Sequence, residues 1–197
     1  MAAFADVFTN DSVITAPDQN QFSICFDHGC ASVAAVSLSE QQWLWVSNFF
    51  ISQAKTPEEE RQRIAWAIAL LEKIVGKLTG TDNDKGGDLE GLGQPGQMDC
   101  IDESTNSTTY LRILSQAGLL KWHEVEDRVT RGWFITGWPH TTAVIRDTQD
   151  NQRYAVDSWF LDNGEQPFVV PLEIWKSGWD PLNLKPPYMP PQPKQAE

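Results

Sequence analysis

One long amphipathic segment sets the strongest limit on what this chain can fold into. In TPEEERQRIAWAIALLEKIVGKLTG, Thr56 suits the N-cap of a helix, Pro57 suits its first turn and Gly80 suits its end. Apolar residues recur between them at helical spacing: Ile64, Ile68, Leu71, Ile74, Val75 and Leu78. The segment therefore predicts a helix with one face buried in the protein core.

The remaining segments predict an α+β layout in which helices precede antiparallel strands. Ser39 and Gln42 form a capping box that starts an earlier helix, and a third helix runs from Asp99 to Gly118. Extended segments are expected at 122–129, 132–137, 140–146, 152–159 and 167–172. This order of elements is typical of an α+β domain.

The chain is long enough for one domain with flanking segments. Its 197 residues include nine tryptophans and are 41% apolar, which suffices for one core of ordinary size. We expect an N-terminal arm and extended segment over 1–38, with a turn at 27–29. The main domain follows over 39–185, and 186–197 form a Pro-rich tail.

The excess of acidic residues argues against two classes of partner. The chain has 27 Asp and Glu against 15 Lys and Arg, whereas nucleic acids and anionic membranes require clustered positive charge. No apolar run approaches the roughly 18 residues that cross a bilayer. We therefore expect neither a nucleic-acid partner nor a membrane span, and no pattern indicates an oligomeric state.

Two cysteines lie close together in ICFDHGCAS. Cys25 and Cys30 either form a local disulfide or remain two small buried thiols, because His28 and Asp27 supply too few ligands for a metal site. A disulfide would indicate a periplasmic or secreted protein whose signal peptide is absent from this chain. If the thiols of Cys25 and Cys30 are free, the alternative location of the protein is the cytoplasm.

The stretch TDNDKGGDLEGLGQPGQ invites comparison with a calcium-binding loop. It departs from the EF-hand pattern, because Gly86 replaces an acidic ligand and Gly93 occupies the place of the final glutamate. We interpret it as a solvated linker, and the chain shows no pattern for a metal or another cofactor.

A third cysteine follows this linker, in GQMDCIDEST. Cys100 falls in the first turn of the third predicted helix, where exposed N–H groups stabilise a thiolate. We expect this effect to lower the thiol pKa against the opposing charges of Asp99 and Asp102. A nucleophilic thiol also requires a base and a third group that orients the base. The chain has three histidines that could be that base: His28, His123 and His140.

His140 is the favoured base because it opens the predicted strand PHTTAVIRD. Asp157 lies on the returning strand RYAVDSWF. A turn centred on residues 150–151 places Asp157 opposite Val144, and a wider turn would bring it closer to His140. His28 and His123 are kept in reserve, and His123 is expected to be exposed.

The motifs DCIDEST, PHTTAVIRD and RYAVDSWF together resemble the signature of bacterial transglutaminase-like cysteine proteinases, a branch of the papain-fold superfamily. In that family a cysteine starts a helix, a histidine starts a strand some 40 residues later, and an aspartate lies on the next strand. The match covers 96–159. It implies a papain/transglutaminase-like α+β fold, with the nucleophile helix packed on an antiparallel sheet, and it makes 39–185 the catalytic domain.

The resemblance also implies a role for each matching residue. Cys100 would be the nucleophile, His140 the general base and acid, and Asp157 the carboxylate that fixes the imidazole tautomer. The Cys100 N–H would be one oxyanion donor, and the side chain of Gln94 or of Gln97 the second.

Some members of that family bind calcium through acids beside the cysteine. Asp99 and Asp102 flank Cys100 and are therefore weak calcium candidates, although a helix-capping function explains them more simply. The chain departs from the family pattern after these acids, where Ser104 to Ser107 replace the usual small-residue run.

Two functions are consistent with these residues. The first is a thiol-dependent amidase, a cysteine peptidase or acyl transferase that forms a thioester with a protein or peptide substrate and needs no cofactor. The second is a non-catalytic module on the same fold, which binds peptide or glycan in a groove lined by tryptophans. These would be Trp133, Trp138, Trp159, Trp175 and Trp179.

Overall fold

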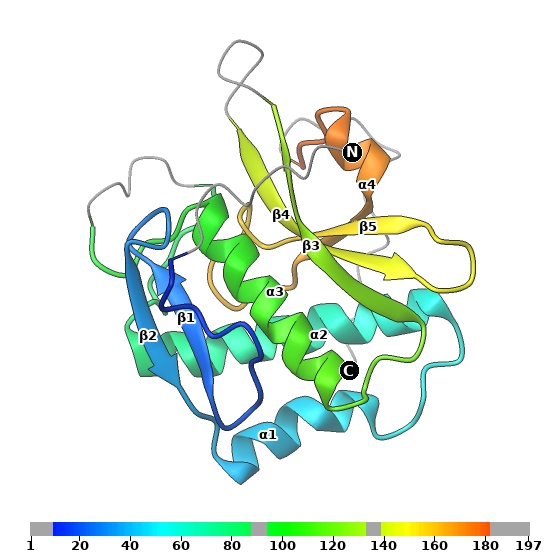
Figure 1. The fold of residues 1–197 in the computed structure, drawn as a ribbon, viewed down its shortest axis with the longest axis horizontal. Coiled ribbons are helices and arrows are strands. Elements are labelled where there is room, and N and C mark those ends of the chain that lie inside the picture. Colours follow the sequence, from blue (N-terminus) through cyan, green and yellow to red (C-terminus); the bar gives the residue numbers. More distant parts are fainter. Residues whose placement is uncertain (1–9, 88–93, 133–138, 182–197) are drawn as a thin grey trace, which may run out of the picture.

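A central helix separates two antiparallel sheets in the computed structural model, which describes residues 10–87, 94–132 and 139–181. Helix α3 (Cys100–Gln116) lies between a hairpin and a four-stranded sheet (Figure 1). The hairpin strands are β1 (Phe22–Phe26) and β2 (Ser32–Val36). The sheet has the order β3-β4-β5-β6: β3 (His123–Arg131), β4 (His140–Asp147), β5 (Arg153–Asp157) and β6 (Phe168–Pro171).

The other helices surround this arrangement. They are α1 (Glu40–Ser47), the short 3₁₀ helix η1 (Asn48–Phe50), α2 (Pro57–Thr79) and α4 (Leu172–Lys176). The combination of helices with antiparallel sheets confirms the α+β class. Within the residues that the structure describes, no helix has both the length and the hydropathy needed to cross a bilayer.

Helix α2 begins and ends where the sequence predicts. The Thr56 side chain accepts a hydrogen bond from the Glu59 N–H, and Gly80 closes the helix in the left-handed conformation at φ 80°. The predicted stripe is buried from Ile64 to Val75, but Leu78 is 54% exposed. The core thus does not reach the last turn of this helix, and the expectation that Leu78 is buried is wrong.

The first and third helices also begin as predicted. The capping box between Ser39 and Gln42 is present at α1, and Asp99 caps α3. The segment 167–172 is only partly a strand, because β6 ends at Pro171 and the short α4 follows it. Of the predicted strand 132–137, residues 133–137 lie outside the described residues.

The register between β4 and β5 differs from the predicted one. Val144 pairs with Ala155, so Asp157 lies two residues nearer to the start of β4, level with Thr142. The reason is the turn, in which Asp147 and Gln152 close a loop centred one residue earlier than expected. The shift brings Asp157 within reach of the first residue of β4.

The hairpin contributes to the main core. Phe22, Ile24 and Val36 pack with apolar residues of α2 and α3 in one buried cluster. A second cluster lies beneath α4 and contains Trp175 and Trp179. Phe22 and Ile24 are almost completely buried, so the segment 22–36 is an integral part of the fold.

The burial of α2 leads to a stability prediction. Leu71 is completely buried, so Leu71→Ala should reduce the free energy of unfolding by about 2–5 kcal/mol through lost apolar contacts and a residual cavity. Chemical denaturation measures the loss. Leu78→Ala, on the exposed last turn of the same helix, is the matched control and should change stability by less than about 0.5 kcal/mol. Equal losses would contradict the assignment of the buried face.

Candidate active site

His140 and Asp157 form a buried hydrogen-bonded pair at one end of the sheet. His140 is the first residue of β4 and Asp157 the last of β5, two adjacent antiparallel strands. The Nε2 atom of His140 lies 2.7 Å from Oδ2 of Asp157, and both side chains are almost fully buried. When this carboxylate accepts the Nε2 proton, Nδ1 is the imidazole nitrogen that carries the free lone pair.

Asp157 receives two further hydrogen bonds. The indole N–H of Trp175, on α4, donates to the same Oδ2 atom at 2.7 Å. The backbone N–H of Trp159 donates to Oδ1 at 3.3 Å. The sequence gives no signal for the bond from Trp175, because it depends on where α4 packs rather than on residue spacing.

Aromatic side chains enclose the imidazole of His140. Its ring centroid lies 4.9 Å from that of Trp159, 5.2 Å from that of Phe160 and 5.5 Å from that of Trp175. These contacts restrict rotation of the imidazole. Trp175 and Trp179 are buried, and Trp159 is half-buried, whereas Trp133 and Trp138 lie outside the described residues.

Cys100 is the first residue of α3 and lies beside the strand end that carries His140. Its sulfur is 4.0 Å from the carbonyl oxygen of Pro139, and the backbone N–H of Thr141 also donates to it. These two residues flank His140 in the sequence. The structure thus brings His140 and Asp157 into contact and places Cys100 next to them, without a hydrogen bond between Cys100 and His140 in the described part of the chain.

The environment of Cys100 favours the thiol over the thiolate. Burial is the largest effect and raises the pKa of Cys100 to about 11, and the charges of Asp99 and Asp157 act in the same direction. Backbone hydrogen bonds from Thr141 and from Cys100 itself oppose these effects but are weaker. The expectation of a lowered thiol pKa is therefore wrong for the resting protein, because desolvation outweighs the helix N-terminus.

The two acids beside Cys100 serve the backbone. Oδ1 of Asp99 accepts hydrogen bonds from the N–H groups of Ile101 and Asp102, and its Oδ2 accepts one from Gly29. The completely buried Asp102 accepts bonds from the N–H groups of His28 and Cys30. Helix capping and support of the β1–β2 turn account for both carboxylates without calcium.

The β1–β2 turn that these carboxylates support has an unusual backbone conformation. Asp27, His28, Gly29 and Cys30 all have positive φ, a conformation that side chains other than glycine rarely adopt. Burial and the neighbouring charge of Asp99 raise the pKa of Asp102 to about 7. The predicted turn at 27–29 is confirmed, and the first turn of α3 holds it in place.

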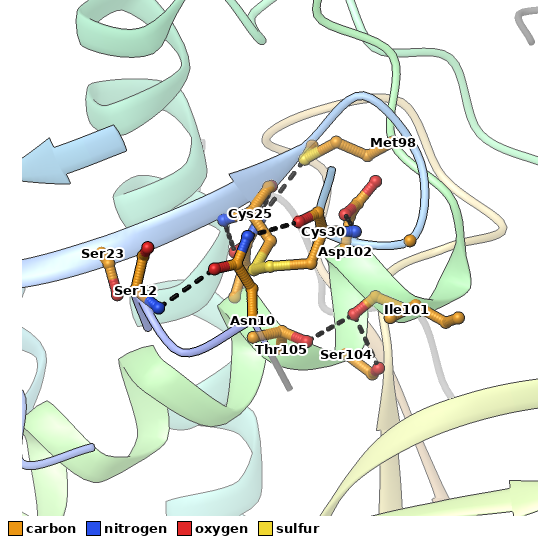
Figure 2. Close-up of a disulfide and its surroundings, with 12 residues drawn as sticks. Asn10, Ser12, Ser23, Cys25, Cys30, Met98, Ile101, Asp102, Ser104 and Thr105 are labelled. Atoms are coloured by element: carbon orange, nitrogen blue, oxygen red, sulfur yellow. Dashed lines mark hydrogen bonds between the residues drawn. A yellow bond between two sulfur atoms is a disulfide. The ribbon is translucent and has the colours of Figure 1, made fainter. Parts of the chain in front are cut away.

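The disulfide between Cys25 and Cys30 is confirmed and closes this turn. Figure 2 shows it against the first turns of α3, with Asp102 beside Cys30. The two sulfurs and an oxygen of Asp102 lie within 4.8 Å of one another. Because the sulfurs are bonded to each other, they are not available as thiolate ligands for a metal.

The two glutamine candidates differ in their environment. The Gln97 amide is buried, and it donates to the backbone oxygen of Asn83 while accepting from the N–H of Lys85. It therefore fixes the loop that precedes α3. Gln94 is exposed and lines a hollow together with Asp27, His28 and Pro95.

The reserve histidines have different environments. His123 is buried and its Nδ1 lies 2.9 Å from Oε1 of Glu60, so the expectation of an exposed side chain is wrong. Glu60 also accepts bonds from the N–H groups of Lys121 and Trp122, which explains why this pair is buried at the start of β3. Nε2 of His28 is buried and has no hydrogen-bond partner among the described residues.

A second group of acids is buried around α3. What we call the acid cluster consists of Glu72 of α2, Glu103 of α3 and Asp84, which lies outside both helices. Within this cluster, Asp84 and Glu103 share a hydrogen bond. Burial raises the pKa of Glu72 and of Asp84 to about 7, and it raises that of Glu103 well above its ordinary value. The sequence places Glu103 in a helix first turn but gives no sign that it is buried.

Comparisons of this chain with models of known protein families, with curated proteins and with solved structures found no match in any of the three.

The raised thiol pKa predicts how Cys100 reacts with iodoacetamide. Because only the thiolate reacts, the rate for the folded protein should rise about tenfold per pH unit between pH 6 and 9.5, without a plateau. Quenched samples analysed by mass spectrometry give the rate at Cys100. Unfolded protein is the control: its rate should reach half of its maximum at about pH 8.5 and level off above about pH 9.5. A folded-state plateau near pH 7 would show a preformed thiolate instead.

The acid cluster predicts how stability depends on pH. Its members bind protons more tightly in the folded state, so their stabilisation is complete near pH 4 and is lost as pH rises to about 7. The free energy of unfolding should therefore fall less between pH 5 and 8 in Glu72→Gln than in the wild type. The difference should be on the order of 1 kcal/mol or more.

Urea denaturation at both pH values measures this change. The exposed Glu165→Gln is the matched control and should leave the pH dependence as in the wild type. If Glu72→Gln and the wild type lose the same stability between pH 5 and 8, Glu72 is not protonated in the folded protein.

Proposed function

We propose that the protein is a thiol-dependent amidase that attacks a peptide or isopeptide amide and forms a thioester on Cys100. In this proposal His140 is the general base and acid, and Asp157 orients it. The protein would be a cysteine peptidase or acyl transferase with a transglutaminase-like, papain-type fold. The disulfide favours a periplasmic or secreted location over the cytoplasm.

One observation carries this proposal. The buried hydrogen bond between His140 and Asp157 joins the ends of two strands, and the sulfur of Cys100 contacts the carbonyl of the residue just before His140. A buried imidazole with a carboxylate on one nitrogen is suited to proton transfer at the other. The sole free cysteine among the residues that the structure describes lies at that place, at the start of a helix.

The raised thiol pKa determines how the first step would proceed. Because Cys100 is protonated at rest, Nδ1 of His140 would accept its proton as the sulfur attacks the substrate carbonyl. Asp157 would stabilise the imidazolium that forms. This is general-base activation at the moment of attack, unlike a site that stores a thiolate–imidazolium pair before substrate binds.

The tetrahedral intermediate would form at the N-terminus of α3. The N–H of Cys100 belongs to the first turn, where the helix cannot satisfy its own amides, so it can donate to the oxyanion. We retain Gln94 as the second donor, because the amide of Gln97 is already used by the neighbouring loop. His140 would then protonate the departing amine and leave the thioester.

The acceptor of the acyl group decides between the two reaction types. Water gives hydrolysis and an amine gives acyl transfer, and in both cases Nδ1 of His140 would remove the proton from the incoming nucleophile.

The environment of the tryptophans favours this enzyme over a non-catalytic binding module. Trp175 and Trp179 are buried in the core beneath α4, so these two do not line an open groove. The indole of Trp175 instead binds Asp157.

Acylation of Cys100 tests the proposal. On incubation with p-nitrophenyl acetate, the wild type should release nitrophenol in a burst and carry one acetyl group on Cys100, which hydroxylamine removes. Cys100→Ala should abolish the burst. Asp157→Asn should slow acylation by roughly 10²–10⁴-fold, because the imidazole then presents the wrong tautomer.

Asp127→Asn, which changes an exposed carboxylate on β3, is the matched control and should acylate at the wild-type rate. Circular dichroism checks that the variants remain folded. An acetyl group that forms on Cys100 equally fast in Asp157→Asn and in the wild type would exclude catalysis by this triad.

A further inference from the structure

We propose that Trp175 is a positioning residue of this site: its indole N–H fixes the carboxylate of Asp157 and thereby the tautomer and orientation of His140. The inference rests on the proposed function and adds to it a contribution from helix α4, which lies outside the three matching motifs.

The hydrogen bonds at Asp157 are the first argument. His140 and Trp175 both bind Oδ2 at 2.7 Å, while the N–H of Trp159 binds Oδ1. A carboxylate held at both oxygens has no freedom to rotate about its last bond. The Trp175 N–H therefore determines where Oδ2 meets the imidazole.

The position of the indole is the second argument. Trp175 is completely buried, and its ring lies 5.5 Å from that of His140 at an interplanar angle of 36°. One side chain thus contacts both members of the pair: its N–H binds the carboxylate, and its ring limits rotation of the imidazole. A residue that only filled space would not need its polar atom at the carboxylate.

Arg131 provides the third argument, because it holds Trp175 from the neighbouring strand. Its guanidinium carbon lies 4.3 Å from the centroid of the Trp175 ring, and the guanidinium also donates to the backbone oxygen of Trp175. Arg131 pairs directly with His140 across β3 and β4. The strand pair that carries the base thus also anchors the residue that orients it.

Replacement of Trp175 by phenylalanine tests the inference. Trp175→Phe keeps an aromatic ring but removes the N–H, so kcat for acylation should fall roughly 10- to 100-fold while KM changes less than about twofold. The acid limb of the pH–rate profile should move to higher pH, because a carboxylate with fewer donors stabilises the imidazolium more strongly.

Trp179→Phe is the matched control. Trp179 is buried in the same apolar cluster but contacts Phe160 and Phe168 rather than Asp157. Trp179→Phe should lose about as much stability as Trp175→Phe, but it should keep the wild-type pH–rate profile. If both variants lower kcat equally without moving the profile, Trp175 has only a structural function.

A second measurement does not depend on activity. In a Cys100→Ala background, ¹⁵N NMR should show His140 as the single Nε2–H tautomer, and Trp175→Phe should mix the two tautomers. An unchanged tautomer would overturn the inference. If the wild type is not acylated but the tautomer responds, the proposed function fails and the positioning function stands.

An isostere covers the case in which Trp175→Phe does not fold. Benzothienylalanine at position 175 keeps the indole shape and replaces the N–H by sulfur, so it should mix the tautomers without loss of packing. Retention of the single tautomer with this side chain would overturn the inference equally.

Discussion

The rest of this structure depends on the hydrogen bonds that the buried carboxylate of Asp102 accepts. From Asp102 to Leu111, helix α3 is buried between the hairpin and the sheet, where water cannot satisfy unpaired polar groups. Asp102 accepts N–H groups from the β1–β2 turn, and the Asn106 amide pairs with both the N–H and the C=O of Cys25. The polar face of α3 thus binds the edge of β1 and the β1–β2 turn, and this holds the helix against the hairpin.

Helix α3, held in this way, also contributes a buried carboxyl group to the acid cluster. Glu103 lies one turn after Cys100, and it packs near Glu72 and Asp84 rather than in solvent. Burial keeps these carboxyls protonated to unusually high pH, because the charged forms cannot be solvated. The same desolvation acts on Cys100, so the fold that places this thiol beside His140 also suppresses its ionisation.

In the proposed mechanism the His140 pair overcomes this suppression, because the imidazole accepts the thiol proton during attack. The imidazole comes from β4, the carboxylate from β5 and a further hydrogen-bond donor from α4, so three elements separated in sequence must pack correctly before the imidazole is oriented. The aromatic rings of Trp159 and Phe160 pack against the imidazole. In the proposed mechanism the proton leaves Cys100 only when substrate is attacked, which would protect the thiol from adventitious reaction at rest.

Local signals in the sequence determined the start and end of α2, the capping of α1 and α3, the turn at 27–29 and the proximity of Cys25 to Cys30. Each depends on residues within a few positions of one another, where backbone sterics and capping hydrogen bonds decide the outcome. The order of Cys100, His140 and Asp157 along the chain was likewise visible.

Only the tertiary structure decided which long-range contacts form. A turn centred one residue earlier moved Asp157 toward His140, and burial reversed the expected direction of the Cys100 pKa. The exposure of Leu78 and the hydrogen bond from Trp175 also depend on how distant elements pack. Desolvation and cross-strand register are properties of the assembled core, and no short stretch of sequence contains them.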